Sequence, residues 1–289
     1  LDTIDGRHCE IVVADDHSHD RSLDEVRRRF PDVRFVAHDT RRGVASTKDL
    51  GARSASGDVL VFLDGHCKPE PGAITRLVED VEEFDGRAVM TPAVSALNTD
   101  TWENQANVGN GYWVELTQFK CGWCERARLR RRGRFYESPA LIGCCVAISR
   151  GLYQELLGFD TGMREWGSED TDFGLKAWFM GSLILNDPEA VVGHRFRASF
   201  DNFEVSAVHP LVNQLRMARK NFDDSIWDEW LTASHRRYEQ LPALWSDVWT
   251  VFERGRESVE TERAYLLDHR TRDEYWFAEY FDLPWPRHD

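Results

Sequence analysis

The sequence predicts an α/β fold in which a mainly parallel sheet is flanked by helices. The first observation is that short apolar runs alternate with amphipathic segments along the first third of the chain. The second is the run Val59–Leu63, whose apolar residues end abruptly in Asp64, Gly65 and His66. A short apolar run of this kind is typical of a strand buried on both faces. Ligands of such sheets bind beyond the carboxyl ends of the strands, which is where these polar residues lie.

The expected elements follow one another closely along the chain. Ser22, with Glu25 three residues later, forms a capping box at the start of the first helix. The helix expected at 69–84 carries its apolar residues on one stripe. The strands expected in this part are 10–14, 33–37, 59–63 and 88–92, and the helices are 23–30, 43–56 and 69–84.

Composition argues against several classes of function. The 289 residues include 50 acidic and 36 basic side chains, which gives a net charge of −14. This balance argues against a nucleic acid or an anionic membrane surface as the main partner. No apolar run approaches the length of a membrane span. We therefore expect a soluble, cytoplasmic protein, and a place at the cytoplasmic face of a membrane stays open. Six cysteines in a chain of this length do not suggest a disulfide scaffold.

Two polar clusters follow expected strands. Asp15 and Asp16 come after the first strand, where a carboxylate can accept a hydrogen bond from a base N–H or a ribose hydroxyl. Asp64 and His66 come after the central strand, and alternation would place both side chains on one side of an extended segment. Oxygen and nitrogen ligands of this kind suit Mn²⁺, Mg²⁺ or Zn²⁺. The alternatives are a polar turn at the first cluster and solvent-facing residues at the second.

A third cluster is Trp166-Gly167-Ser168-Glu169-Asp170, in which Glu169 begins a helix with one apolar face. Acidic residues at a helix N-terminus can simply offset the macrodipole. In the functional interpretation, one carboxylate binds a ligand and the other removes a proton in a reaction.

Taken together, these motifs resemble a known family. The segments are DDHSHD, RRGVASTKDLGARSASGD, VLVFLDGHCKPEPG, LIGCCVAISRGLYQELLGFDTGMREWGSEDTDFGLKAWFMG and VVGHRFR. In this order they resemble nucleotide-sugar glycosyltransferases of the GT-A fold, in particular family 2 enzymes and the polypeptide N-acetylgalactosaminyltransferases. The similarity covers about Cys9 to Trp230. It implies an enzyme that moves a sugar from a UDP-sugar donor to a hydroxyl of a glycan or peptide acceptor.

The resemblance also implies residue roles. Asp64 and His66 match the metal-binding Asp-x-His pair, and His194 matches the third ligand of a Mn²⁺ or Mg²⁺ ion. Asp15 and Asp16 would contact the uracil. The nucleotide-sugar-binding residues implied in this way are Asp15, Asp16, Arg42, Lys48, Asp64, Trp166 and Arg197.

The sequence departs from the polypeptide transferases at Glu169-Asp170, where those enzymes carry Glu-Asn and retain configuration. A carboxylate can accept a proton and an amide cannot. We therefore expect an inverting transfer in which Asp170 is the catalytic base and Glu169 its catalytic partner. The alternatives are a retaining enzyme like the polypeptide N-acetylgalactosaminyltransferases, or a nucleotide-sugar-binding protein that kept the fold without activity.

We expect a catalytic domain at residues 1–230 and a helical, aromatic-rich extension at 231–289. The resemblance implies that the first strand and helix of the GT-A fold are missing from this sequence. The extension could wrap the domain, border the acceptor groove or pair two subunits as a homo-oligomer. Cys121 and Cys124 have zinc-ligand spacing without a second cysteine pair, and the basic run Arg126–Arg134 is either a solvated face or a loop near the substrates.

Overall fold

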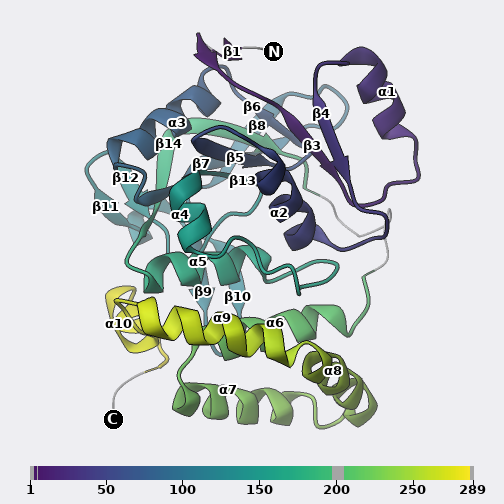
Figure 1. Cartoon of the computed structure of the whole chain (residues 1–289). Coiled ribbons are helices and arrows are strands. Elements are labelled where there is room, and N and C mark those ends of the chain that lie inside the picture. Colours follow the sequence, from purple (N-terminus) through teal and green to yellow (C-terminus); the bar gives the residue numbers. More distant parts are fainter. Residues whose placement is uncertain (1–2, 5, 197–204, 287–289) are drawn as a thin grey trace.

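The computed structural model describes residues 3–4, 6–196 and 205–286, which form a sheet-containing layer resting on a group of helices (Figure 1). The strands are β1 Thr3–Ile4, β2 Arg7–His8, β3 Val12–Asp15, β4 Arg34–Ala37, β5 Val59–Leu63, β6 Cys67–Pro69, β7 Ala88–Leu97, β8 Asn104–Gly109, β9 Tyr112–Glu115, β10 Lys120–Trp123, β11 Arg130–Arg132, β12 Phe135–Glu137, β13 Cys145–Ser149 and β14 Leu183–His194. The α-helices are α1 Ser22–Arg29, α2 Val44–Ser54, α3 Ala73–Glu83, α4 Arg150–Glu155, α5 Glu169–Phe179, α6 His209–Asn221, α7 Asp224–Arg237, α8 Pro242–Arg254, α9 Arg256–His269 and α10 Glu274–Tyr280.

The main sheet is mixed, so the prediction of a mainly parallel sheet is wrong. In the described residues it has the order β11-β12-β14-β7-β13-β5, with β6 paired to β14 and β8 paired to β7. The pair β14–β7 is parallel, whereas β13 is antiparallel to both β5 and β7. The prediction assumed a helical crossover between successive strands. Instead, the chain between β7 and β13 forms the short strands β8 to β12 and re-enters the sheet from the opposite end.

The first strands lie apart from this sheet. β3 and β4 form their own parallel two-stranded sheet, against which α2 packs. The helix α1 begins at Ser22, one residue before the expected start, and Arg21 takes the N-cap position. Glu10, just before β3, accepts hydrogen bonds from the backbone N–H groups of Ser56 and Gly57, just before β5. This contact holds the beginnings of β3 and β5 at the same end of the molecule.

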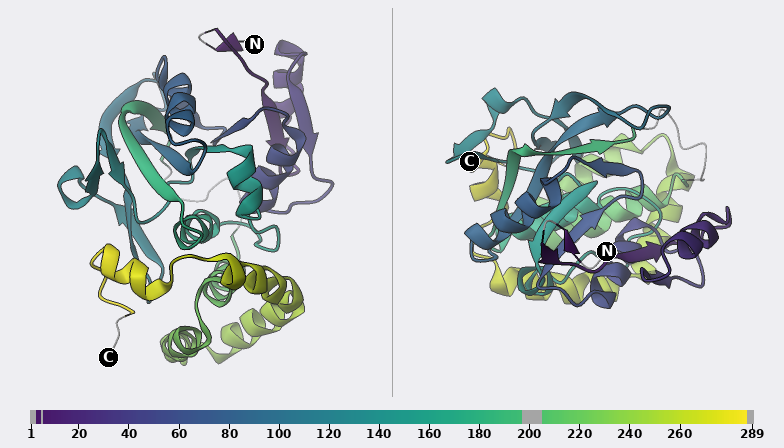
Figure 2. Two further views of the ribbon diagram at one scale, coloured as in Figure 1. Left: turned by 60° about the vertical axis from the view of Figure 1, so that its left-hand side comes forward. Right: turned by 90° about the horizontal axis from the view of Figure 1, so that it is seen from above.

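Helices cover both faces of the main sheet. Successive residues of a strand point to opposite faces. In β7, Val89 accordingly joins the core with α5, while Ala88 and Met90 join a second cluster under α3. Figure 2 shows α3 on one side of the sheet and the helices α6 to α10 on the other.

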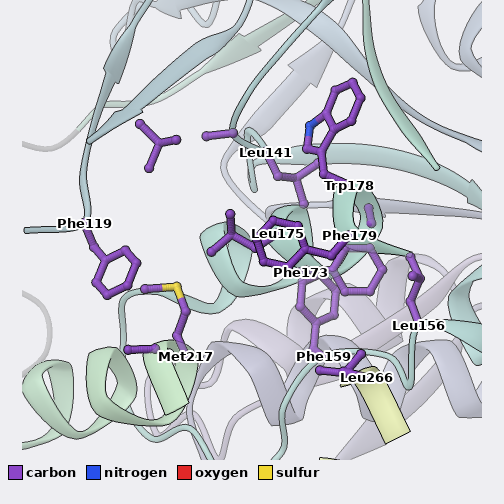
Figure 3. Close-up of a cluster of buried hydrophobic side chains, with 14 of the residues drawn as sticks. Phe119, Leu141, Leu156, Phe159, Phe173, Leu175, Trp178, Phe179, Met217 and Leu266 are labelled. Atoms are coloured by element: carbon purple, nitrogen blue, oxygen red, sulfur yellow. The ribbon is translucent and has the colours of Figure 1, made fainter. Parts of the chain in front are cut away.

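The larger core is centred on α5, whose side chains are buried all around the helix. Figure 3 shows Phe173 and Phe179 of α5 between Leu141 and Trp178 on one side and Met217 and Leu266 on the other. A helix whose residues are buried on every face is enclosed by other elements on every face. The N-terminus of α5, which carries Glu169 and Asp170, is therefore held by tertiary packing.

The C-terminal helices wrap the domain. α9 and α8 pack on α6, and α10 packs on α5. Phe252 and Phe277 are fully buried in the same core as α5. Helix α7 runs across residue 230, so the division at that position stays a prediction. In the described residues, no helix is both long and apolar enough to cross a membrane.

Candidate active site

Three potential metal ligands converge at the carboxyl end of β5. Asp64 follows this strand, His66 precedes β6, and His194 ends β14, which pairs with β6 so that His194 lies opposite Cys67. The ligand atoms of the three side chains all lie within 4.8 Å of one another. The Nε2 atoms of His66 and His194 are 3.0 Å apart, and Nε2 of His194 lies 3.9 Å from Oδ2 of Asp64.

A turn, not an extended segment, brings Asp64 and His66 together. The backbone N–H of Cys67 donates to the carbonyl oxygen of Asp64 at 3.0 Å, which closes a tight turn around Gly65. A Cβ atom built on Gly65 would meet no atom within 4 Å. The space beside this turn is therefore open, as the approach of a ligand requires.

The spacing of these side chains fits a divalent cation. Two ligands that bind one ion at about 2.1 Å and at right angles are about 3 Å apart, which matches the two imidazole nitrogens. One carboxylate with two imidazoles suits Mn²⁺, Mg²⁺ or Zn²⁺. Within the described ranges, this is the one group of three or more such residues that could hold an ion. The group does not include Cys121 or Cys124.

Lys48 lies beneath this cluster. Its ammonium donates to the carbonyl oxygen of Gly143 at 2.6 Å and lies 3.2 Å from Oδ1 of Asp64. Burial disfavours its charge, but the negative charges of Asp64 and Glu169 prevail and raise the pKa of Lys48. Lys48 is partly buried and interacts with the charges of Asp64, Glu169 and Asp170, so it links the metal ligands to the acidic pair on α5.

Glu169 and Asp170 form the first turn of α5. The chain enters this helix through Gly167 and Ser168, both with positive φ angles. Oε2 of Glu169 accepts a hydrogen bond from the backbone N–H of Gly167 at 3.1 Å. Burial first, and the charge of Asp170 second, raise the pKa of Glu169 to about 7, while Lys48 acts in the opposite direction. A helix N-terminus that merely neutralised its dipole would not need a buried carboxyl group.

Asp170 lies in a close-fitting space beside Gly143. A Cβ on Gly143 would come within 3.0 Å of Cβ of Asp170 and 3.1 Å of its Oδ2. Oδ1 of Asp170 accepts from the backbone N–H of Thr171 at 2.7 Å. Burial is the main cause that raises the pKa of Asp170. The absence of a side chain at Gly143 thus sets the position of this carboxylate.

In the first acidic cluster, Asp15 closes a local turn and Asp16 makes a long-range contact. Oδ2 of Asp15 accepts from the N–H of Ser18 at 3.0 Å, which is the bonding expected of a polar turn. The two carboxylate oxygens of Asp16 accept from the backbone N–H groups of Arg42 and Gly43 at 2.6 and 2.8 Å. Asp16 is therefore fixed at the start of α2, and each oxygen retains acceptor capacity for a ligand.

Of the remaining predicted site residues, two lie exposed on the surface and one lies outside the described residues. Trp166 is 47% exposed on the loop before α5, where its indole can meet a ligand. The exposed Arg42 shares a surface hollow with Arg41, Arg164, Glu165 and His209. Arg197 lies outside the described residues.

Sequence reasoning missed the hairpin β9–β10 as part of this site. Sγ of Cys121 lies 3.4 Å from Oγ1 of Thr171, next to Asp170. At the end of the hairpin, the ring of Trp123 makes an edge contact with Phe196, which in turn contacts His194. Trp123 lies far from Phe196 and His194 in the sequence, and the hairpin brings them together. No periodic sequence pattern could therefore predict this contact.

Family models match most of this site. Residues 1–157 match the model described as glycosyl transferase family 2, and residues 127–190 match the model described as the N-terminal domain of galactosyltransferase. The first match covers β3 to α4, including the turn with Asp64 and His66. The second covers the segment that contains Glu169 and Asp170.

The curated relatives are glycosyltransferases of similar type. The chain is 30% identical to polypeptide N-acetylgalactosaminyltransferase 12 of Mus musculus over 197 residues, which is 65% of this chain and 34% of that protein. It is 26% identical to polypeptide N-acetylgalactosaminyltransferase 10 of Rattus norvegicus over 245 residues, which is 81% of this chain and 40% of that protein. The chain thus matches less than half the length of these relatives.

Solved structures agree on the fold. GalNAc-T7, crystallised with UDP, GalNAc and Mn²⁺, superimposes with a TM-score of 0.72 at 24% identity, covering 94% of this chain and 51% of that one. S. aureus TarS residues 1–349, in complex with UDP-GlcNAc, gives a TM-score of 0.52 at 16% identity, covering 96% of this chain and 84% of that one. The family match over more than half of the sequence and this shared GT-A architecture show that the chain belongs to glycosyl transferase family 2.

Proposed function

We propose that this domain transfers a hexosyl or N-acetylhexosaminyl group from a UDP-sugar to a hydroxyl group of a glycan or peptide acceptor. The observation that carries the proposal is the convergence of Asp64, His66 and His194 near the acidic pair of α5, in which Glu169 is buried and Asp170 is partly buried. The solved relatives crystallised with UDP or UDP-GlcNAc support the choice of donor. The curated relatives, which are N-acetylgalactosaminyltransferases, support UDP-GalNAc as the first sugar to test.

Asp64, His66 and His194 are proposed to hold Mn²⁺ or Mg²⁺. When bound, such an ion neutralises the charge that develops on the departing diphosphate. The arginines of the surface hollow support binding of an anion nearby. Burial, followed by the charges of Arg42 and Arg216, lowers the pKa of Arg164, so a bound anion would relieve repulsion among these cations.

Asp170 is proposed as the general base of an inverting transfer. In this step the acceptor oxygen forms a bond to the sugar's anomeric carbon, the bond from that carbon to the UDP oxygen breaks, and Asp170 takes the acceptor's proton. The raised pKa of Asp170 strengthens it as a base. Glu169, whose carboxyl points back to Gly167, is proposed to hold the hydroxyls of the donor sugar.

The retaining alternative is favoured by one specific observation, the similarity to polypeptide N-acetylgalactosaminyltransferases over 65–81% of the chain. The position that distinguishes the two mechanisms is Asp170, which is a carboxylate here. The anomeric configuration of the product decides between them.

The test is a donor screen that measures UDP release from UDP-GalNAc, UDP-GlcNAc, UDP-galactose and UDP-glucose, with and without Mn²⁺. Hydrolysis without an acceptor reports donor use even while the acceptor is unknown. We expect Mn²⁺-dependent release from at least one donor. If calorimetry shows Mn²⁺-dependent UDP binding but no donor is turned over even with mixed glycan and peptide acceptors, the non-catalytic alternative is correct.

A further inference from the structure

Helix α6 carries a stripe of buried polar side chains. Asn213, Arg216 and Lys220 follow one another at intervals of three and four residues, which places them on one face of the helix. They are 1%, 2% and 0% exposed. Burying polar and charged groups costs free energy unless each finds a partner. All three find partners within residues 160–172, the segment that leads into the acidic pair on α5.

Arg216 and Lys220 hold the two ends of this segment. The guanidinium of Arg216 donates to both carboxylate oxygens of Asp160, at 2.9 and 2.7 Å. The ammonium of Lys220 donates to Asp160 at 2.7 Å and to Asp172, on α5, at 3.0 Å. These ion pairs fix where the segment leaves the preceding loop and where it joins α5.

Asn213 binds the middle of this segment. Its Oδ1 accepts from the backbone N–H of Arg164 at 3.1 Å, and its Nδ2 donates to the carbonyl oxygens of Arg164 and Gly167 at 2.9 and 3.0 Å. A side-chain amide has the same donor and acceptor groups as a peptide unit. Asn213 therefore pairs with residues 164–167, here called the strap, much as a neighbouring strand would.

The strap contacts both halves of the site. On one side, the carbonyl oxygen of Glu165 accepts from the N–H of Val44, and Gly43, beside it, binds Asp16. A Cβ on Gly43 would collide with the backbone of Glu165, so the strap lies directly on this glycine. On the other side, the N–H of Gly167 donates to Glu169. The strap thus links the start of α2 with the carboxyl group of Glu169.

The strap and its exit have a backbone conformation that the sequence does not favour. Glu165 and Ser168 have φ angles of 56° and 72° although neither is glycine. A residue other than glycine is strained in this left-handed region. External hydrogen bonds must therefore hold the segment in place, and those from Asn213 reach both Arg164 and Gly167.

We propose that Asn213 is a positioning residue that sets the conformation of the strap and thereby the orientation of Glu169 in the site. This inference rests on the proposed function for its catalytic consequence. Its conformational part stands on the hydrogen bonds alone, and the two parts have separate measurements.

The catalytic part is tested with Asn213→Ala. Asn213 contacts none of the proposed metal ligands, so UDP affinity in the presence of Mn²⁺ should be retained. Turnover should fall about tenfold to a hundredfold, because displacement of a reacting group by about 1 Å has effects of this size.

The matched control is Asn221→Ala on the same helix. Asn221 is equally buried and donates to Asp172 and the carbonyl oxygen of Met217, but it does not touch the strap. The control should lose stability and keep its turnover.

The conformational part is measured without activity. In Asn213→Ala, the amide of Arg164 should exchange its hydrogen faster, and trypsin should cut after Arg164 in the native protein. The Asn221→Ala control should show neither change. Asn213→Asp keeps the acceptor for the N–H of Arg164, but it replaces the amide that donates to the carbonyl oxygens of Arg164, Trp166 and Gly167 with a carboxylate. Exchange at the strap, corrected for intrinsic rates, should therefore be faster at pH 8 and partly restored at pH 5.

The outcomes separate the two proposals. If the strap keeps wild-type protection and turnover in both Asn213 variants, the inference is wrong. If the strap loosens but turnover matches that of Asn221→Ala, Asn213 positions the strap without affecting Glu169, and the catalytic part is wrong. If the wild-type protein binds no UDP with Mn²⁺, the proposed function fails, while the exchange data still decide the conformational part.

Discussion

His66 and His194 bring their Nε2 atoms to 3.0 Å from each other although 128 residues separate them in the chain. The pairing of β6 with β14 creates this contact, because it places His194 beside the turn that carries His66. Two imidazole nitrogens at this distance either share one hydrogen bond or bind one ion. The second possibility is the basis of the first prediction.

His194→Ala should weaken Mn²⁺-dependent UDP binding by at least about tenfold, a loss that is typical even of residues that only support metal ligands. Calorimetry with UDP and Mn²⁺ measures this. The melting temperature in the presence of chelator should change little, and His269→Ala, at an exposed position on α9, is the control. A large loss of stability without metal would show that His194 is a packing residue.

Asp170→Asn should lower turnover by about 10²–10⁴-fold, the usual contribution of a positioned base, and should leave UDP affinity nearly intact. The product of an α-linked UDP-sugar should be β-linked, as read from the anomeric coupling in a proton NMR spectrum. An α-linked product, or unchanged turnover in the variant, would favour the retaining mechanism.

Gly143→Ala should lower turnover while leaving Asp170 chemically intact. The added Cβ would stand about 3 Å from Asp170 and would force the carboxylate to move. Steady-state kinetics should show the loss mainly in kcat. The control is Gly151→Ala in α4, where a Cβ meets nothing within 4 Å and no change is expected. Equal kinetics for the two variants would contradict a fixed position for Asp170.

Glu169→Gln should stabilise the metal-free protein more at pH 8 than at pH 5. The pKa of Glu169 is raised from 4.5 to about 7, so the folded state keeps a proton that the unfolded state loses between these values. Stability is therefore lost as pH rises through this window, by up to about 3 kcal/mol. Gln cannot ionise and removes the loss. Urea unfolding with chelator at both pH values measures the difference, and an equal effect at both would refute the assignment.

Lys220→Met should destabilise the fold by about 3–5 kcal/mol, because it leaves the buried carboxylates of Asp160 and Asp172 with less compensating charge. Urea unfolding should show the loss, and adding Asp172→Leu should recover part of it. Lys120→Met, at an exposed strand end, should change stability by less than about 0.5 kcal/mol.

The local sequence pattern was enough to predict individual strands and helices, because each is formed by residues that are close together in the sequence. The apolar run Val59–Leu63 is a strand in the structure, and the helix expected from Glu169 is α5. The polar residues after β5 also identified the metal-ligand candidates Asp64 and His66. These features depend on neighbours in sequence, where periodicity and the ends of apolar runs carry the information.

Tertiary structure decided what depends on residues far apart in the chain. The direction of β13 follows from the excursion through β8 to β12, which carries no periodic signal, so the sheet became mixed. The place of Lys48 under Asp64, and the fit of Asp170 against Gly143, depend on how α2, β13 and α5 meet. The stripe Asn213, Arg216 and Lys220 has helical spacing in the sequence, but a polar stripe is normally a solvated face. Only the burial of α6 under α8 and α9 turned it into the support of the strap, because buried polar groups must find partners and the strap provides them.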